Sequence, residues 1–276
     1  MGKLYVCATP IGNLEDVSIR LLKVLRKVDV IVCEDTRQTV KLLNRYRIKK
    51  HLLTYHKFSG KVEEDKLIEQ LKAGKVIALV SDAGIPAISD PGQNLIRKAI
   101  EASIDIEIIP GPSALISALV ISGLDSSAFV FEGFLPNRKG KRQETLKKLQ
   151  EEMRTVIIYE APHRLLALLE DIEEIMGKDR QLVLARELTK KHEEVKRGRV
   201  SDLREHFEKH LPRGEITVLI KGKETIKNQV DLQTVTREVE ALVEKGMKKN
   251  EAFKMKAKEY NIKKSDIYNY YVNKCQ

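Results

Sequence analysis

Short apolar runs alternate with amphipathic stretches along most of the chain. Runs at 3–8, 76–80 and 106–109 are apolar enough to form buried strands, and the stretches between such runs repeat apolar residues at helical spacing. Strands that alternate with helices join as parallel neighbours. The pattern therefore predicts an α/β fold with a mostly parallel sheet covered by helices.

A second block of strands begins after residue 115. We expect an N-terminal α/β domain at 1–115 and a second α/β domain at 116–223, whose sheet is mixed in direction. The strands expected in this second sheet are 128–135, 155–159, 181–185, 195–198 and 214–220.

The composition changes after Gly222. Residues 225–230 are polar and lack periodicity, which is typical of a linker. The extension at 231–276 is rich in lysine and is predicted to form three short helices, at 235–245, 249–260 and 265–272. Short helices joined by a tight turn are typical of a helix-turn-helix module, but a helical cap packed on the main body would give the same pattern.

Two strands of the first block end in loops of small residues. Ser81-Asp82-Ala83-Gly84-Ile85-Pro86 follows the run at 76–80, and Pro110-Gly111-Pro112-Ser113 follows the run at 106–109. A third such loop follows the first strand. Ordinary strand-to-helix turns also use glycine and proline. Three such loops together favour a ligand crevice at the carboxyl ends of the strands.

Charge and cysteine content limit the partners, metal sites and cellular compartment to be expected for this chain. The net charge of +10 permits binding to RNA or DNA, although a solubilising surface would give the same value. The chain has no tryptophan, so aromatic stacking platforms for bases cannot be numerous. Its three cysteines lack disulfide or metal-finger spacing, and we expect no metal site. No signal peptide or membrane-length apolar stretch is visible, which favours the cytoplasm.

Eight motifs occur in an order that identifies a family. The motifs are Ala8-Thr9-Pro10-Ile11-Gly12-Asn13-Leu14, Glu34-Asp35-Thr36-Arg37, Ser81-Asp82-Ala83-Gly84-Ile85-Pro86, Pro110-Gly111-Pro112-Ser113-Ala114, Gly133-Phe134-Leu135-Pro136, Tyr159-Glu160-Ala161-Pro162-His163-Arg164, Ala185-Arg186-Glu187-Leu188-Thr189-Lys190 and Arg213-Gly214-Glu215. In these motifs the chain closely resembles the ribosomal RNA small subunit methyltransferase I family, which belongs to the tetrapyrrole methylase superfamily.

The resemblance implies a fold, a reaction and partners. The fold is the two-domain fold of the class III S-adenosylmethionine (SAM) methyltransferases, with an appended helical domain and SAM bound between the two α/β domains. The reaction is 2'-O-methylation of a cytidine in the decoding region of 16S rRNA, with 16S rRNA or the small ribosomal subunit as partner. Members are usually homodimers.

The resemblance also implies where SAM is held. The contacts come from the loop after the first strand, from the central loop, from the loop at 113–114 and from the second domain. The implied cofactor residues are Pro10, Ser81, Asp82, Ala83, Gly84, Ile85, Ser113, Ala114, Tyr159 and Leu188. Two positions depart from related patterns. The first loop lacks the glycine-rich GxGxGD of the tetrapyrrole enzymes, and position 85 is Ile where Thr is common.

Small-residue loops suit SAM because backbone groups can approach adenine and the carboxylate closely. A ribose hydroxyl is a poor nucleophile, so a base or a cation nearby would assist methyl transfer. Glu160 and Lys190 are our candidates for this catalytic role, with Glu34 and Arg37 as alternatives. Each could instead be structural: Glu160 could anchor the residues after it, and Lys190 could contact RNA phosphate.

The loop Arg138-Lys139-Gly140-Lys141-Arg142 is the best candidate for RNA contact, because cations around a glycine can follow a phosphate backbone. Such a run is equally typical of a solvated loop. A second candidate patch lies in the C-terminal extension. It comprises Lys248, Lys249, Lys263 and Lys264.

Two other functions remain open at this point. A methylase of a tetrapyrrole-like small molecule is disfavoured by the basic charge and by the first loop. A non-catalytic nucleic-acid-binding protein that uses its C-terminal helices is disfavoured by the small-residue loops on several strands.

Overall fold

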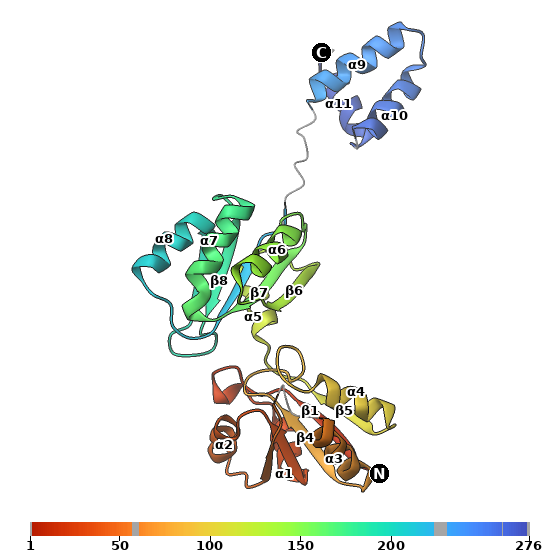
Figure 1. Cartoon of the computed structure of the whole chain (residues 1–276). Helices are drawn as coiled ribbons and strands as arrows, with labels where there is room; N and C mark the ends of the chain where they lie inside the picture. The colour runs from red at the N-terminus through yellow and green to blue at the C-terminus, as the bar shows by residue number, and fades with distance from the viewer. Residues whose placement is uncertain (1, 57–60, 224–230, 261, 275–276) are drawn as a thin grey trace. The chain divides into compact units, whose positions relative to one another are not determined.

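The computed structural model describes residues 2–56, 61–223, 231–260 and 262–274. The chain divides into two compact units, Met1–Lys223 and Glu224–Gln276, and each is described by itself. The first unit contains two five-stranded sheets, and Figure 1 shows α5 (Ala114–Ser122) between them.

The first sheet is entirely parallel, with strand order β3-β2-β4-β1-β5. Alternate residues of each strand face opposite helical layers, as the two-residue period of a strand requires. Tyr5 and Cys7 pack toward α1 and α2, whereas Leu4 and Val6 pack toward α3 and α4. The elements are β1 (Lys3–Cys7), η1 (Leu14–Asp16), α1 (Ile19–Lys27), β2 (Val30–Cys33), α2 (Thr36–Arg45), β3 (His51–Thr54), α3 (Lys61–Lys72), β4 (Val76–Val80), α4 (Gln93–Glu101) and β5 (Asp105–Ile109).

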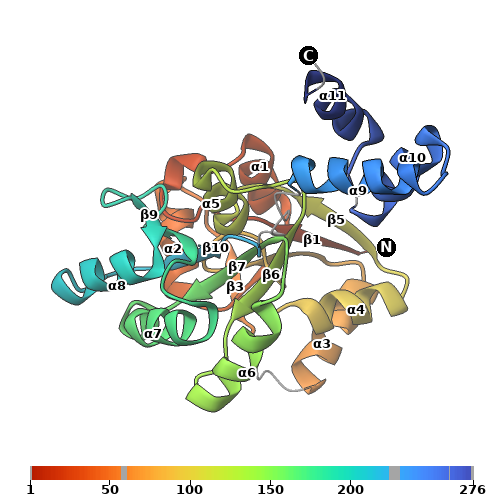
Figure 2. The same ribbon diagram turned by 90° about the horizontal axis from the view of Figure 1, so that it is seen from above.

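The second sheet has the order β6-β7-β10-β8-β9 and is mixed, as expected: β6 and β7 are parallel, and the other neighbours are antiparallel. One face packs on α6, α7 and α8, and the other packs on α5 (Figure 2). The elements are β6 (Phe129–Phe134), α6 (Lys139–Leu149), β7 (Thr155–Glu160), η2 (Pro162–Arg164), α7 (Leu165–Met176), β8 (Gln181–Arg186), β9 (Glu194–Arg199), α8 (Val200–Lys209) and β10 (Ile216–Ile220).

The second unit contains α9 (Leu232–Glu244), α10 (Lys249–Glu259) and α11 (Lys264–Lys274). Its small core holds Val235 and Val239 from α9, Phe253 from α10 and Ile267 from α11. Three helices therefore form at the places that the periodicity predicts. The linker expected at 225–230 lies outside the described residues.

The structure departs from the expected elements at three points. The basic segment expected to be a loop is instead the start of α6, which begins at Lys139. Helix α8 was not expected, although Val200, Leu203 and Phe207 are its buried face. The boundary expected at 115/116 falls inside α5, and α5 packs on the second sheet through Ala118 and Leu119.

Candidate functional site

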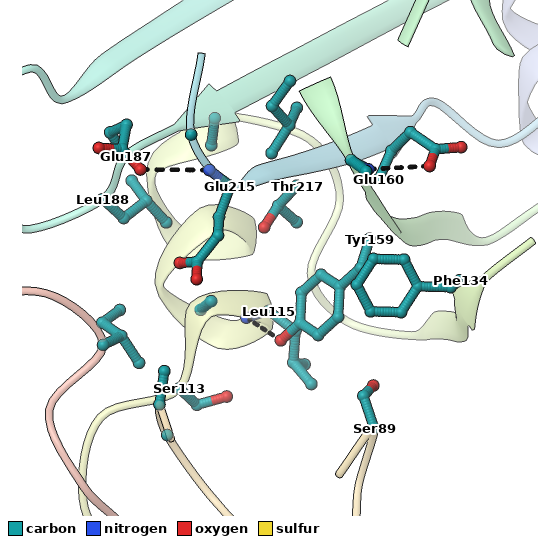
Figure 3. A pocket seen from close by; sticks show the side chains of 18 of the residues that line it. Ser89, Ser113, Leu115, Phe134, Tyr159, Glu160, Glu187, Leu188, Glu215 and Thr217 are labelled. Atoms are coloured by element: carbon teal, nitrogen blue, oxygen red, sulfur yellow. Dashed lines mark hydrogen bonds between the residues drawn. The ribbon is translucent and has the colours of Figure 1, made fainter. Parts of the chain in front are cut away.

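A cavity of about 460 Å³ lies where loops of the two sheets meet. This volume is within the usual range for a small-molecule site. In Figure 3, Ser89 and Ser113 approach from loops of the first sheet, while Tyr159, Phe134, Glu187 and Glu215 come from the second. The loops meet because the parallel strands of the first sheet end at one edge. This is the edge at which α/β proteins bind ligands.

The antiparallel direction of β10 explains why its first residues reach the same cavity. Ile216 pairs with Glu160 at the end of β7 and with Arg186 at the end of β8. The start of β10 therefore lies beside the ends of its two neighbours. Gly214, Glu215 and Thr217 line the cavity as a result.

Two hydroxyl groups hold the small-residue loop after β4. Thr9 and Gly84 form a two-way backbone bridge, with N···O distances of 2.8 and 3.1 Å. Thr9 Oγ1 donates to the Ser81 carbonyl at 3.1 Å, and Ser81 Oγ donates to the Gly84 carbonyl at 2.9 Å. The backbone of Ala83, Gly84 and Ile85 is thereby fixed at the cavity wall, where it can face a ligand without an intervening side chain.

An aromatic group forms the opposite wall. The Tyr159 hydroxyl oxygen accepts a hydrogen bond from the backbone N–H of Leu115 at 3.1 Å, which ties β7 to the first turn of α5. The ring of Tyr159 contacts Phe131 and Phe134, with centroid distances of 5.0 and 5.8 Å. These contacts fix the ring at the edge of the cavity, where it offers an apolar surface.

Lys190 is held by two carboxylates. Its Nζ lies 2.9 Å from Glu187 Oε1 and 3.1 Å from Glu215 Oε2. Burial acts to lower the pKa of Lys190, but the hydrogen bonds and charges of Glu187 and Glu215 outweigh it and raise the pKa. Lys190 is therefore a cation at neutral pH. It can stabilise negative charge, but it cannot serve as a proton acceptor.

Left-handed backbone is concentrated in the loops beside the cavity. Three of the five described non-glycine residues with positive φ lie in these loops: Ala87 at +68°, Glu187 at +51° and Thr189 at +65°. This conformation is unusual, above all for a β-branched residue such as Thr189. Strain of this kind persists where the surroundings impose it, and it is found most often at functional sites.

Asp90 lines the cavity from the loop between β4 and α4. Burial raises the pKa of its carboxyl group to about 6, and the nearby carboxylates of Glu34, Asp82 and Glu215 add to the increase, while a hydrogen bond with Ser81 opposes it. The neighbouring Ser89 also lines the cavity, and its Oγ is buried with no hydrogen-bond partner among the described residues.

Most of the expected cofactor residues lie at the cavity. Seven of the ten line it: Ala83, Gly84, Ile85, Ser113, Ala114, Tyr159 and Leu188. Pro10, Ser81 and Asp82 are not among the described lining residues. Asp82 accepts a hydrogen bond from the Asp35 backbone N–H at 3.0 Å, so in this structure it holds the neighbouring loop.

Glu160 borders the cavity, but its carboxyl group is fully buried. Its Oε1 accepts from the Ala161 backbone N–H at 2.8 Å and pairs with Arg164 Nε at 3.1 Å. Burial raises its pKa, and these two contacts oppose the increase. The structure therefore argues against Glu160 as a group that touches substrate. Its contacts match the anchoring role left open as the alternative.

Arg142 requires a correction. Its guanidinium is buried and lies 2.6 Å from the buried carboxylate of Asp171. It is therefore not available to RNA phosphate. Arg138, which precedes α6, is exposed, as are Lys139 and Lys141 in the first turn of that helix; the Lys139 Nζ also lies 3.8 Å from the Asp171 carboxylate. The alternative catalytic candidate Arg37 is also exposed, and it forms a bidentate pair with Asp35, in which Nε donates to Oδ1 and Nη2 donates to Oδ2.

Sequence reasoning gave no role to Asp90, Glu187 or Glu215, all of which line the cavity. The sequence did mark the segments that hold them, since Asp90 lies shortly after the small-residue loop and the other two lie within quoted motifs. For Glu187 and Glu215 the missing signal was the pairing of β10 with β7 and β8, because no local pattern encodes which strands become neighbours.

The described residues include no group of three His, Cys, Asp or Glu side chains suited to a metal. None of the helices in the described ranges has both the length and the apolar character needed to cross a bilayer. Cys7 and Cys33 are buried free thiols, and Cys275 lies outside the described residues.

Comparisons with known proteins agree with this geometry. Residues 3–204 match the family model of the Tetrapyrrole (Corrin/Porphyrin) Methylases. The chain is 53% identical over 224 residues to ribosomal RNA small subunit methyltransferase I of Thermotoga maritima, covering 81% of this chain and 100% of that relative. It is 43% identical over 270 residues to the protein of that name from Synechocystis, covering 97% of this chain and 96% of the relative.

The fold is shared with solved structures of more distant proteins. Uroporphyrin-III-C-methyltransferase from Thermus thermophilus superposes with a TM-score of 0.57 at 22% identity, over 79% of this chain and 94% of that one. At this identity the likeness concerns the fold alone, and it confirms the expected two-sheet architecture.

Proposed function

Because the chain belongs to the tetrapyrrole methylases and, among them, to the ribosomal RNA small subunit methyltransferase I family, we propose that it methylates the 2'-hydroxyl of a cytidine in the decoding region of 16S rRNA. Family membership confirms the resemblance inferred from the motifs, and with it a SAM-dependent methyltransferase activity. The cytidine and its 2'-oxygen are our proposal.

The observation that carries this proposal is the cavity with its fixed backbone wall. A SAM molecule carries a sulfonium and an ammonium group. The cavity lining presents the carboxylates of Asp90, Glu187 and Glu215, and among the described lining residues Lys190 is the one cation. Opposite charges attract strongly where water is partly excluded, so this set of side chains fits a cationic ligand. The apolar wall of Phe134 and Tyr159 fits an adenine ring.

We assign SAM contacts to the lining residues first. The backbone at Ala83, Gly84 and Ile85, the loop at Ser113 and Ala114, and the side chains of Tyr159 and Leu188 would hold it. Ser81 and Asp82 would act through these residues, because their hydrogen bonds hold the loops in place. Pro10 is buried and precedes Ile11, which lines the cavity, so it would act by placing that loop. SAM supplies an activated methyl group, so the protein mainly has to orient the two reactants.

Lys190 retains a catalytic role in this proposal, as a cation. Its ammonium group is fixed at the cavity by Glu187 and Glu215, where it would stabilise negative charge on a ribose oxygen or on a neighbouring phosphate.

RNA affinity should depend mainly on phosphate contacts. We propose that Arg138, Lys139 and Lys141 supply part of them from the start of α6, where all three are exposed. In the second unit, Lys248 and Lys263 are exposed. By contrast, the ammonium groups of the other two lysines have partners within the unit. Lys249 Nζ lies 4.1 Å from the centroid of the Tyr271 ring, and Lys264 Nζ donates a hydrogen bond to Asn250 Oδ1. Lys248 and Lys263 are therefore the stronger candidates of that patch.

We further propose that the protein is a homodimer and acts in the cytoplasm on the small ribosomal subunit or its RNA. Helix α5 is apolar nearly all round. One side is buried against the second sheet, but Ile116 and Val120, one turn apart, are 45% and 72% exposed. An apolar stripe of this kind is typical of an interaction surface. A second copy of the chain is the occupant we expect there.

A methyl-transfer assay with labelled SAM tests the proposed function. Three substrates would be compared: bare 16S rRNA, isolated small subunits and a uroporphyrinogen-type tetrapyrrole. We expect label in RNA, at the 2'-oxygen of one cytidine by mass spectrometry of nuclease digests. Label on a base, or transfer to the tetrapyrrole alone, would refute the proposal. A Val120→Glu variant, sized by light scattering, separately tests the dimer.

A further inference from the structure

The motif Glu34-Asp35-Thr36-Arg37 lies beside the cavity, and the proposed function assigns it no ligand. It follows β2, which pairs with β4, so the loops after these two strands are neighbours. The backbone N–H of Asp35 donates a hydrogen bond to Asp82 Oδ1 at 3.0 Å. Ala83, which follows Asp82, lines the cavity. One hydrogen bond therefore joins the turn that carries Arg37 to the loop that forms the cavity wall.

The charges of this turn also act on the carboxyl groups of the site. Burial is the main cause that raises the pKa of Asp82, and the positive charge of Arg37 opposes the increase. Burial also raises the pKa of Asp90, which lines the cavity, and the negative charge of Glu34 adds to that increase. Groups that shift each other's pKa through their charges lie close together. The turn at 34–37 therefore adjoins the site.

The Arg37 guanidinium is fixed along one edge and open along the other. Its Nε donates to Asp35 Oδ1 at 3.0 Å, and its Nη2 donates to Asp35 Oδ2 at 2.7 Å. A guanidinium has five N–H donors, so three remain, and these have no partner among the described residues. The Arg37 side chain is 87% exposed, whereas that of Asp35 is 24% exposed. The open edge is therefore accessible to a ligand.

The charges that line the cavity do not favour an RNA strand. Asp90, Glu187 and Glu215 are all acidic, and they repel the phosphate groups on either side of a target nucleotide. Lys190, the one cation among the described lining residues, is already paired with two of these carboxylates. A further cation beside the cavity is needed to hold the phosphate backbone there. Arg37 suits this task, because an arginine fork fits two phosphate oxygens and a side chain that is already fixed loses little entropy on binding.

We propose that Arg37 binds a backbone phosphate next to the methylated nucleotide and so places its ribose at the cavity; this inference rests on the proposed function. The carboxylate of Asp35 orients the guanidinium. The N–H groups of the open edge donate to the phosphate oxygens. Arg37 is then a substrate-binding residue that exchanges no proton with the ribose.

The test compares the wild type with Arg37→Met, which keeps the aliphatic stem and removes the cation. The Kd for the RNA substrate, measured by filter binding, should rise about tenfold, as expected for the loss of a hydrogen bond to a charged group. The slope of log affinity against log salt concentration should become shallower by about one. The kcat at saturating RNA should change by less than about twofold, because the phosphate is held equally before and during methyl transfer.

Three comparisons control this test. The Kd of Arg37→Met for SAM should equal that of the wild type, which would show that the variant is folded and that Asp35 still holds Asp82. Arg45→Met is the matched control, because Arg45 is exposed at the other end of α2 and also pairs with a carboxylate, that of Glu15, at 3.2 Å. It should bind RNA as the wild type does. Arg37→Lys should restore the salt dependence and part of the affinity, since lysine binds phosphate as a point charge.

The outcomes separate this inference from the proposed function. If the wild type methylates no RNA, the proposed function fails, and this inference fails with it. If the wild type methylates RNA and Arg37→Met binds RNA as Arg45→Met does, the phosphate contact alone is wrong. A loss confined to kcat would overturn the inference as well, because Arg37 would then act on the transition state. An Arg37→Lys variant with the salt dependence of Arg37→Met would also contradict it.

Discussion

The backbone N–H of Asn13 donates a hydrogen bond to Thr189 Oγ1 at 3.0 Å. Asn13 follows β1 of the first sheet, and Thr189 follows β8 of the second, so this bond links the loops that enclose the cavity. The approach is close: a Cβ atom on Gly12 would lie 2.5 Å from Lys190 Cγ. Contact between the two loops therefore requires glycine at position 12.

Replacing Thr189 by valine should weaken SAM binding. Valine keeps the branched shape but removes the acceptor for Asn13, at a cost of about 0.5–1.5 kcal/mol, which corresponds to roughly a twofold to twelvefold rise in Kd if the whole cost falls on the bound state. Calorimetric titration with SAM measures this change in Kd. Thr189→Ser retains the hydroxyl and should bind as the wild type does. Equal affinity of the two variants would contradict a role for this bond.

Gly214→Ala should distort the group around Lys190. Gly214 has φ +78°, and a Cβ atom there would meet Glu187 Oε1 at 2.1 Å. The left-handed backbone alone costs about 1–2 kcal/mol for a residue with a side chain. We expect lower stability in urea unfolding together with weaker SAM binding, since Glu187 must move away from Lys190.

Gly140→Ala is the matched control for that variant. Gly140 lies in α6, with open space around a Cβ atom. Alanine there should leave SAM binding unchanged and should raise stability by up to about 1 kcal/mol, because glycine is unfavourable within a helix. Equal stability and equal SAM affinity of Gly214→Ala and Gly140→Ala would show that the close contact between position 214 and Glu187 has no effect on the site.

Arg142→Met should destabilise the protein by about 3–5 kcal/mol, because it leaves the Asp171 carboxylate buried without its main partner. Unfolding in urea measures the loss. The double variant Arg142→Met, Asp171→Leu removes both charges and should recover much of it. Lys141→Met, at an exposed position on the same turn, should change stability by less than about 0.5 kcal/mol. A stable Arg142→Met that binds RNA poorly would instead support the original RNA-contact assignment.

A chain that ends at Lys223 should bind SAM with unchanged affinity. Residues Met1–Lys223 form a compact unit that contains every residue lining the cavity, and the Thermotoga maritima relative matches 224 residues of this chain over its whole length. The shortened chain should bind RNA more weakly, and its affinity should depend less steeply on salt, because phosphate contacts are lost. Filter binding across a salt series measures both. An unchanged salt dependence would show that the C-terminal helices do not contact RNA.

The sequence by itself determined the elements and the family. Strand and helix periodicity is local, so the strand at 76–80 and the helix at 249–260 are predicted from neighbouring residues alone, and both form there to within one residue. Small residues at strand ends marked the loops that line the cavity, and motif order identified the family. Helix α8 was missed although its apolar spacing was present, because its many charged residues obscured the buried face.

Only the tertiary structure decided what each charged residue does. Whether a carboxylate is free or engaged depends on a partner far along the chain: Arg142 pairs with Asp171, and Lys190 pairs with Glu215. Glu160 ends a buried strand and Asp90 lies in the loop after another, yet the first is buried against Arg164, whereas the second lines the cavity and has no paired cation in the part of the chain that the structure describes. Burial and pairing arise from packing, and packing brings together residues that no local pattern relates.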